Sequence, residues 1–249
     1  MPNADVSVQQ AAYKLVLDRQ VATYNLHEDC HIMVAGNREE DNSFVNPMPE
    51  ALKSRLIHIS VNPSVDEWAD WAYEAQLDPR VISFIKFAPE RLLRTVQDTD
   101  QETYACPRTW HFLSKLMGSY PNVAALDDKA LPIFHQLVYG TVGQADGHYF
   151  LEYVNYFSKL PTMQDLLANA ETIAFPEEMG IQFATCAMLM SHVNKSNFEQ
   201  ALKYIMRLPQ IEMKIMTLKG IFKRNRADQL YGTPAGKKVL SELGDYLFA

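Results

Sequence analysis

From Ser64 to the C-terminus the sequence carries helical patterns with almost no strand pattern, and this restricts the chain to a mainly helical fold. Ser64 is followed three residues later by Glu67, the spacing of a capping box, which begins a helix expected to reach Ala75. Apolar residues recur at helical spacing further on, with prolines and glycines between the runs. The helices expected from these runs span residues 80–88, 90–96, 107–117, 127–139, 147–159, 178–193, 197–208, 212–223 and 235–247.

The first 63 residues have a mixed pattern. A capped helix is expected over Val6–Asp18 and a short one over Pro49–Ser54. The apolar runs His31–Val34 and Leu56–Val61 are predicted to be buried strands, because they are short and bounded by turn residues. The sequence therefore predicts a mainly α fold with a small α/β part of about two to three strands. Pro63 marks a plausible hinge or domain boundary.

Composition favours a cytoplasmic protein without a membrane or nucleic-acid partner. The net charge is −7 and the pI about 5.5, whereas phosphate contacts need clustered Lys and Arg, and the one basic cluster, Lys219–Arg226, is short. The three cysteines, Cys30, Cys106 and Cys186, are far apart, which fits reduced thiols better than a disulfide framework or a zinc site. No apolar run is long enough to span a bilayer and the first residues do not resemble a signal peptide. No metal site is expected, and the acidic run at residues 39–41 is read as an exposed loop.

Two polar residues beside the predicted strands suit a site for nucleotide phosphates. Asn37 follows the run His31–Val34, and Arg55 directly precedes the second run. In a nucleotide-hydrolysing α/β core, ligands collect at the carboxyl ends of the strands, where a polar side chain can contact the γ-phosphate. An arginine, often from a neighbouring subunit, stabilises the charge that develops during phosphoryl transfer. Asn37 and Arg55 suit these two roles.

Asn37 and Arg55 belong to a longer pattern, which consists of Val34–Asn37, Met48–Arg55, Trp68 with Trp71, and Cys106–Trp110. This pattern resembles the second part of a MoxR-type AAA+ ATPase. The resemblance implies that Asn37 is the first sensor, Arg55 the arginine finger and Arg108 the second sensor. All three would be catalytic, and Asn37 and Arg108 would also contact the bound nucleotide.

The resemblance is good over residues 2–117 and weaker beyond residue 140. It implies a partial AAA+ core at 1–63, a helical lid at 64–120 and a helical C-terminal extension at 121–249. Trp68 and Trp71, three residues apart on one predicted helix, would both anchor the core of the lid. ATP and Mg²⁺ are the implied cofactors. The implied activity is ATP-driven remodelling or assembly of a protein partner by a homo-oligomeric ring.

Two motifs that this activity needs are missing from the 249 residues. There is no GxxxxGK[ST] loop to hold phosphates, and no apolar strand ending in Asp-Glu to hold magnesium. The segment Gly232–Lys238 contains Gly-Lys, but Pro234 interrupts it and no strand precedes it. In the family the segment matching Pro2–Asp5 follows the acidic pair, so the chain is expected to begin in the middle of an ATPase domain. We therefore expect no ATP hydrolysis by this chain alone.

Simpler readings of the same residues stay open. Asn37 could form a turn, because asparagine tolerates left-handed backbone. Arg55 could interact with the last carbonyl groups of its own helix, and Arg108 could be a solvated residue of a first helical turn. The whole chain could also be a stand-alone helical interaction protein that binds a partner, or that supplies Arg55 in trans to a separate ATP-binding subunit.

Overall fold

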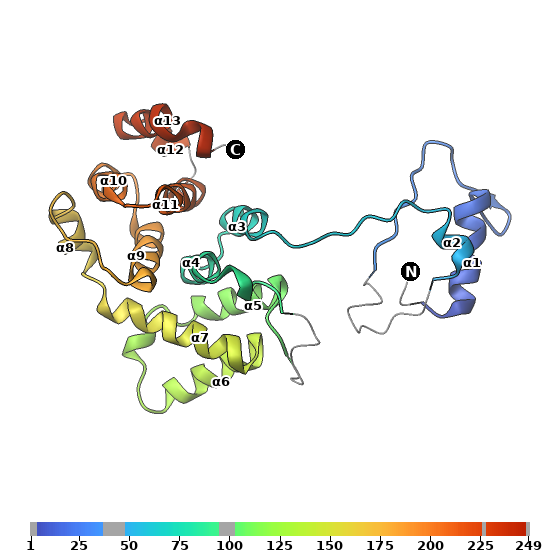
Figure 1. Ribbon diagram of the computed structural model, residues 1–249, viewed down its shortest axis with the longest axis horizontal. Coiled ribbons are helices and arrows are strands. Elements are labelled where there is room, and N and C mark those ends of the chain that lie inside the picture. Colours follow the sequence, from blue (N-terminus) through green and yellow to red (C-terminus); the bar gives the residue numbers. More distant parts are fainter. Residues whose placement is uncertain (1–3, 37–47, 95–102, 226–227, 248–249) are drawn as a thin grey trace. The chain divides into compact units, whose positions relative to one another are not determined.

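A computed structural model describes residues 4–36, 48–94, 103–225 and 228–247 of the chain (Figure 1). The chain divides between Asn62 and Pro63 into a smaller N-terminal unit and a larger C-terminal unit. The described residues are mainly helical, with one two-stranded sheet, so the predicted fold class is confirmed. The two units are described separately below.

The smaller unit begins with helix α1, Val6–Asp18, as the sequence predicts. Arg19 ends the helix in the left-handed region, with φ 53°, and its amide donates to the carbonyl oxygen of Lys14. Strands β1, Gln20–Val21, and β2, Tyr24–Asn25, then form an antiparallel hairpin. A short helix, α2, follows at Glu50–Lys53 within the predicted range, with Pro49 at its N-cap.

The two predicted strands at His31–Val34 and Leu56–Val61 are wrong, because the structure has no strand in either segment. A strand needs a neighbouring backbone to take its N–H and C=O groups. No backbone hydrogen bond joins Ile57–Val61 to any described residue. The side chains of Ile57, Ile59 and Val61 are 91%, 82% and 86% exposed. These segments are rich in residues that favour strands, but they do not pair with the β1–β2 hairpin or with any other described backbone.

The smaller unit has almost no hydrophobic core. Among its described residues, Leu52 of α2 is the one buried apolar side chain, and Gln9 of α1 is also buried. Tyr24 and Met33 are 79% and 94% exposed. Because apolar burial is the main driving force for folding, this unit gains little stability from its own contacts.

The larger unit is entirely helical in its described residues. Its 3₁₀ segments are η2 (Pro89–Arg91), η4 (Val123–Ala125) and η5 (Tyr156–Lys159). Its α-helices are α3 (Val65–Glu74), α4 (Pro79–Phe87), α5 (Pro107–Gly118), α6 (Ala130–Val142), α7 (Gln144–Asn155), α8 (Met163–Ala168), α9 (Met179–His192), α10 (Phe198–Arg207), α11 (Ile211–Arg224), α12 (Asp228–Tyr231) and α13 (Pro234–Leu247).

Most helices of this unit lie where the sequence predicts them. Ser64 caps α3, and its Oγ accepts a hydrogen bond from the amide of Glu67, as the capping-box spacing predicts. The helix predicted over 90–96 is wrong in its described part, since only the 3₁₀ turn Pro89–Arg91 forms and Leu93–Arg94 are not helical. Helix α8 was not predicted, because six residues are too few to show a helical period.

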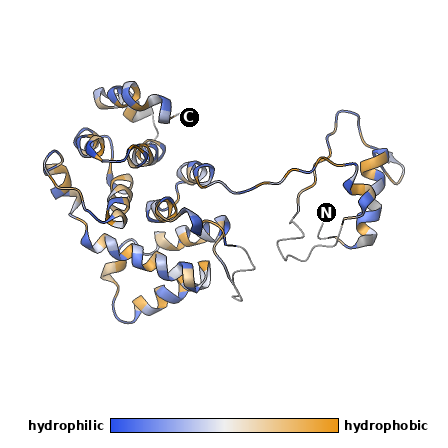
Figure 2. Ribbon diagram, viewed as in Figure 1, coloured by the Kyte–Doolittle hydropathy of each residue, from blue (hydrophilic) through white to orange (hydrophobic). Residues whose placement is uncertain are grey.

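Helix α9 lies at the centre of the larger unit, packed against α4 on one side and α11 on the other (Figure 1). Figure 2 shows hydrophobic and hydrophilic residues mixed along most of these helices, as expected where one face is buried. An aromatic cluster fills the space between α4, α5 and α7. The Phe84 ring lies 5.3 Å from Trp110, 5.3 Å from Phe150 and 5.4 Å from Tyr153, measured between ring centroids.

Candidate functional site

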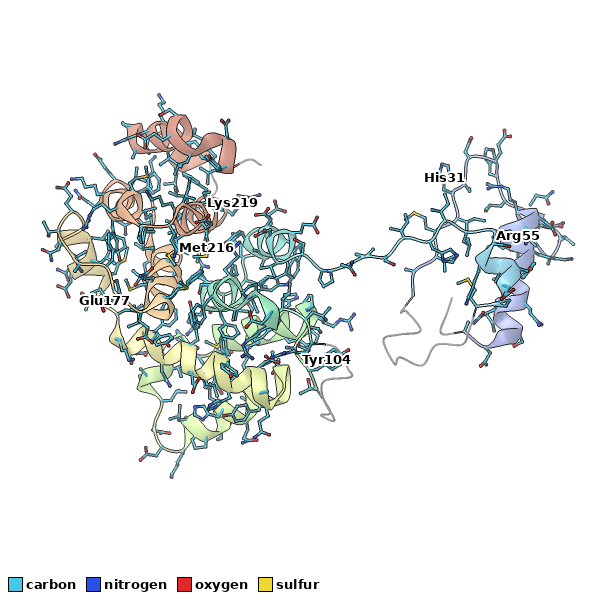
Figure 3. All side chains as sticks on the ribbon, viewed as in Figure 1. His31, Arg55, Tyr104, Glu177, Met216 and Lys219 are labelled. Carbon is cyan, nitrogen blue, oxygen red and sulfur yellow. The ribbon has the colours of Figure 1, made fainter. Side chains whose placement is uncertain are left out.

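Arg55 directly follows Ser54, the C-cap of α2, and is exposed to solvent (Figure 3). Its Nη1 donates to the carbonyl oxygen of Ala51 at 2.9 Å and to the Oγ of Ser54 at 3.1 Å. No carboxylate among the described residues pairs with it. The side chain is therefore held against its own helix and still presents a positive charge to solvent.

Arg108 lies in the first turn of α5, in a helix start that is well defined. Pro107 occupies the first position of the helix, and the amide of Cys106 donates to the Oγ1 of Thr109 at 2.9 Å. The buried Trp110 fixes the next turn in the core. Arg108 is exposed and forms no hydrogen bond or ion pair within the described part of the chain.

Asn37, the third predicted site residue, lies outside the described residues. The segment that leads to it, His31–Gly36, is not a strand. Arg55 belongs to the smaller unit and Arg108 to the larger one. Each of the two arginines is therefore presented by its own unit.

Most other described arginines are bound within the fold, although not all of them are paired with a carboxylate. Arg80 pairs with Asp78 at 2.7 Å and also donates to the carbonyl oxygens of Met117 and Tyr120. Arg207 donates to two backbone carbonyl oxygens and lies over the ring of Phe175. Arg224, an exposed residue at the end of α11, shares the unpaired state of Arg108 among the described residues.

The sequence did not predict a buried ion-pair cluster that Asp146 of α7 forms with Arg91 and Arg94. The carboxylate of Asp146, 5% exposed, accepts from Nη1 of Arg91 at 2.6 Å and from Nε of Arg94 at 3.2 Å. The guanidinium carbon of Arg91 lies 3.4 Å from the centroid of the Tyr149 ring. The amide of Arg94 donates to the carbonyl oxygen of Ala105 at 2.8 Å. This cluster connects α7 to the backbone just before α5 and so supports the helix that carries Arg108.

The lysines of the basic cluster at the end of α11 are paired within the molecule. Lys219, labelled in Figure 3, lies 3.4 Å from Asp70 of α3, and Lys223 bonds Glu74 one turn later. The hydrogen bond from Lys223 lowers the pKa of the Glu74 carboxyl. Because both charges are already matched, this face of α11 is poorly suited to binding nucleic-acid phosphates.

The Gly-Lys segment near the C-terminus begins α13. The amide of Gly236 donates to the Oγ1 of Thr233 at 3.0 Å, and a Cβ at Gly236 would lie 2.1 Å from the carbonyl oxygen of Leu230. The glycine is thus needed for close packing against α12, and its amide is already bonded. This arrangement does not cradle a phosphate.

The described residues contain no group of three or more His, Cys, Asp or Glu side chains placed to hold a metal ion. We therefore assign no described residue as a ligand of Mg²⁺, whose usual ligands are carboxylate, phosphate and water oxygens. The exposed guanidinium groups of Arg55 and Arg108 each offer the charge and the N–H donors that phosphate groups accept. Of the helices that the structure describes, none is both long and apolar enough to cross a bilayer.

Comparison of the chain with protein-family models, curated proteins and solved structures found no match. The function must therefore be argued from the residues and their geometry.

Proposed function

We propose that this chain is the arginine-bearing, lid-containing part of a MoxR-like AAA+ ATPase. Arg55 would be the arginine finger, Arg108 the second sensor and Asn37 the first sensor. The phosphate loop and the magnesium carboxylates would come from polypeptide outside these 249 residues. The complete assembly would be a cytoplasmic homo-oligomeric ring that uses ATP hydrolysis to remodel or assemble a partner protein.

The observation that carries the proposal is the state of the two arginines. Arg55 and Arg108 are exposed and have no carboxylate partner among the described residues, whereas Arg80, Arg91 and Arg94 are bound to aspartates. An arginine that stabilises transferring phosphate must keep its charge available for the ligand. The ordered helix start at Cys106–Thr109 further supports a positioned rather than a freely moving Arg108.

Reconstitution tests this proposal. The full chain is mixed with a MoxR-type α/β fragment that carries the phosphate loop and the acidic pair but ends before the first-sensor strand, and turnover of Mg·ATP is measured. We expect hydrolysis by the mixture and none by this chain alone. Arg55→Ala should lower the rate about a thousandfold or more, the range of arginine fingers, and Arg108→Ala roughly a hundredfold.

Arg224→Ala is the matched control, because Arg224 is also exposed but lies at the C-terminal end of α11. It should leave turnover unchanged. Turnover by the chain alone would contradict the need for an outside phosphate loop. If mixtures made with Arg55→Ala and with Arg108→Ala hydrolyse ATP as fast as the mixture with the unaltered chain, neither arginine belongs to the site.

A second candidate function is a stand-alone interaction protein, favoured by the exposed residues Ile57, Ile59 and Val61. Their extended backbone can add a strand to the sheet edge of a partner. Such a protein could bind a separate ATP-binding subunit and lend it Arg55. Light scattering measures the molar mass of the purified chain with and without the same α/β fragment. A chain that stays monomeric when the fragment is added would argue against this candidate.

A further inference from the structure

We propose that α3 is a detachable helix, a conformational device that leaves the rest of the larger unit as one piece. This inference is independent of ATP chemistry. It rests on how α3 is connected at its two ends, on what holds its outer edge, and on what lies beneath its inner face.

The connections on both sides of α3 permit movement. On its N-terminal side, Ile57–Val61 is extended, exposed and without backbone hydrogen bonds to any described residue. On its C-terminal side, Gln76 has φ 55°, a left-handed conformation that costs energy in a residue other than glycine. Firm attachment resumes at the buried Leu77, whose amide donates to the carbonyl oxygen of Ala72 at 2.9 Å, and continues at Asp78, whose amide donates to the Oγ of Ser114 at 2.7 Å. The helix thus lies between a free segment and a strained turn.

Ion pairs hold the outer edge of α3. Three of its four carboxylates recur every four residues and therefore share one face of the helix. They are 83%, 50% and 63% exposed, so salt screens their pairs strongly. We call these contacts the α3 ion-pair row; its members are Asp66 with Lys86 of α4, Asp70 with Lys219 of α11, and Glu74 with Lys223 of α11.

The inner face of α3 buries two polar atoms that no described residue satisfies. Trp68 and Tyr73 are 7% and 5% exposed, and neither the Trp68 Nε1 nor the Tyr73 Oη has a hydrogen-bond partner in the described part of the chain. Both atoms would regain bonds to water if α3 moved away.

Helix α9 of the same unit serves for comparison with α3, because its side chains are well buried and its polar groups are bonded. The side chains of Thr185 and Ser191 bond carbonyl oxygens of their own helix, and Cys186 and Leu189 are fully buried. The inner face of α3 also buries apolar side chains, Ala69 and Ala72 among them, but it differs from that of α9 in holding two polar atoms that no described residue satisfies. We therefore expect the α3 ion-pair row to supply a larger share of the stability of α3. Weakening the row should release α3 before the rest of the unit opens.

Hydrogen exchange on the full chain tests this device. Amides of α3 and α9 are followed by mass spectrometry at about 10 mM and about 1 M salt, where the Debye length is about 30 Å and about 3 Å. We expect α3 to exchange about tenfold faster at high salt, the size expected from losing three exposed pairs. Exchange in α9 should not change. Equal exchange and equal salt response in the two helices would overturn the proposal.

Charge reversal shows whether the row is responsible. The double variant Lys219→Glu with Lys223→Glu should give fast α3 exchange even at low salt, and adding Asp70→Lys with Glu74→Lys should restore slow exchange. Lys203→Glu, which breaks the exposed pair of Lys203 with Glu171, is the matched control and should leave α3 unchanged. If charge reversal leaves α3 exchange unchanged, the proposal is refuted. The salt series uses the unaltered chain and therefore does not depend on whether a variant folds.

Discussion

The indole Nε1 of Trp110 donates a 2.8 Å hydrogen bond to the carbonyl oxygen of Arg91, so the core side chain of α5 holds the backbone of the arginine that binds Asp146. One buried carboxylate, two guanidinium groups and one indole thus connect α7, η2 and α5. The arrangement determines how the N-terminus of α5, with Arg108, is supported.

Asp146→Asn should destabilise the larger unit by roughly 3–5 kcal/mol, because it leaves two guanidinium groups without their buried counter-charge. Urea unfolding followed by circular dichroism measures the loss. Asp128→Asn, a charge removal at an exposed position, is the control and should change stability by less than about 0.5 kcal/mol. Equal effects of the two substitutions would show that the cluster contributes no specific stability.

Two buried tyrosines should respond in opposite ways to removal of the hydroxyl. Tyr153 Oη donates to the Oγ of Ser83 at 2.7 Å, so Tyr153→Phe should cost about 1 kcal/mol. Tyr73 Oη has no partner among the described residues, so Tyr73→Phe should be neutral or stabilising. Thermal unfolding of the two variants gives the comparison. A loss of stability in Tyr73→Phe similar to that in Tyr153→Phe would mean that the Tyr73 hydroxyl is satisfied.

The three thiols should differ widely in reactivity. Cys30 is exposed, Cys106 is intermediate, and Cys186 is buried, where burial raises its pKa to about 11. A thiol-reactive dye should modify Cys30 first and Cys186 only on unfolding, because the thiolate is the reactive form. Since the folded pKa of Cys186 is raised, its contribution to stability is full below its ordinary pKa and is lost as pH rises through about 11. Cys186→Ala should therefore lose less stability than the unaltered chain between about pH 8 and about pH 10.5.

The sequence predicted local structure well where local chemistry determines it. The N-cap bond at Ser64 and the proline at the start of α5 specify helix starts by contacts within a few residues. The strands at His31–Val34 and Leu56–Val61 failed because a strand depends on a partner that local pattern cannot supply. Trp71 was predicted to anchor the core beside Trp68, yet it is 44% exposed with its ring edge against His111.

Ion pairs between residues far apart in the chain could not be predicted from the sequence. The lysines of α11 meet the carboxylates of α3 across 149 positions, and Arg91 meets Asp146 across 55. No spacing rule relates residues so far apart, so the basic cluster could not be recognised as internally paired. Proline and helix-end signals in the sequence were enough to place Arg55 just after α2 and Arg108 in the first turn of α5. Their roles came from the resemblance alone.

Acid should loosen α3 before it unfolds the larger unit. The hydrogen bonds from Lys86 and Lys223 lower the pKa values of Asp66 and Glu74. A carboxyl with a lowered folded pKa contributes stability above its unfolded pKa and loses it as pH falls through the folded value. We therefore expect α3 exchange to accelerate below about pH 4, relative to the intrinsic rate, before α9 exchange does. High salt, which already screens these pairs, should reduce the difference; an acid response shared equally by both helices would contradict this account.

Limited proteolysis should separate the two units at Leu56–Asn62. A protease that cuts beside apolar residues needs an extended and accessible backbone, and Ile57, Ile59 and Val61 provide both. The first stable product should begin near Pro63 and keep its helical circular dichroism, because the larger unit contains nearly all of the buried apolar side chains of the described chain. The released N-terminal residues should be digested further or aggregate, since an extended segment with unpaired backbone groups and exposed β-branched side chains favours association. Cleavage that starts within α4 or α9, or hydrogen exchange that is equally slow in both units, would contradict this division of stability.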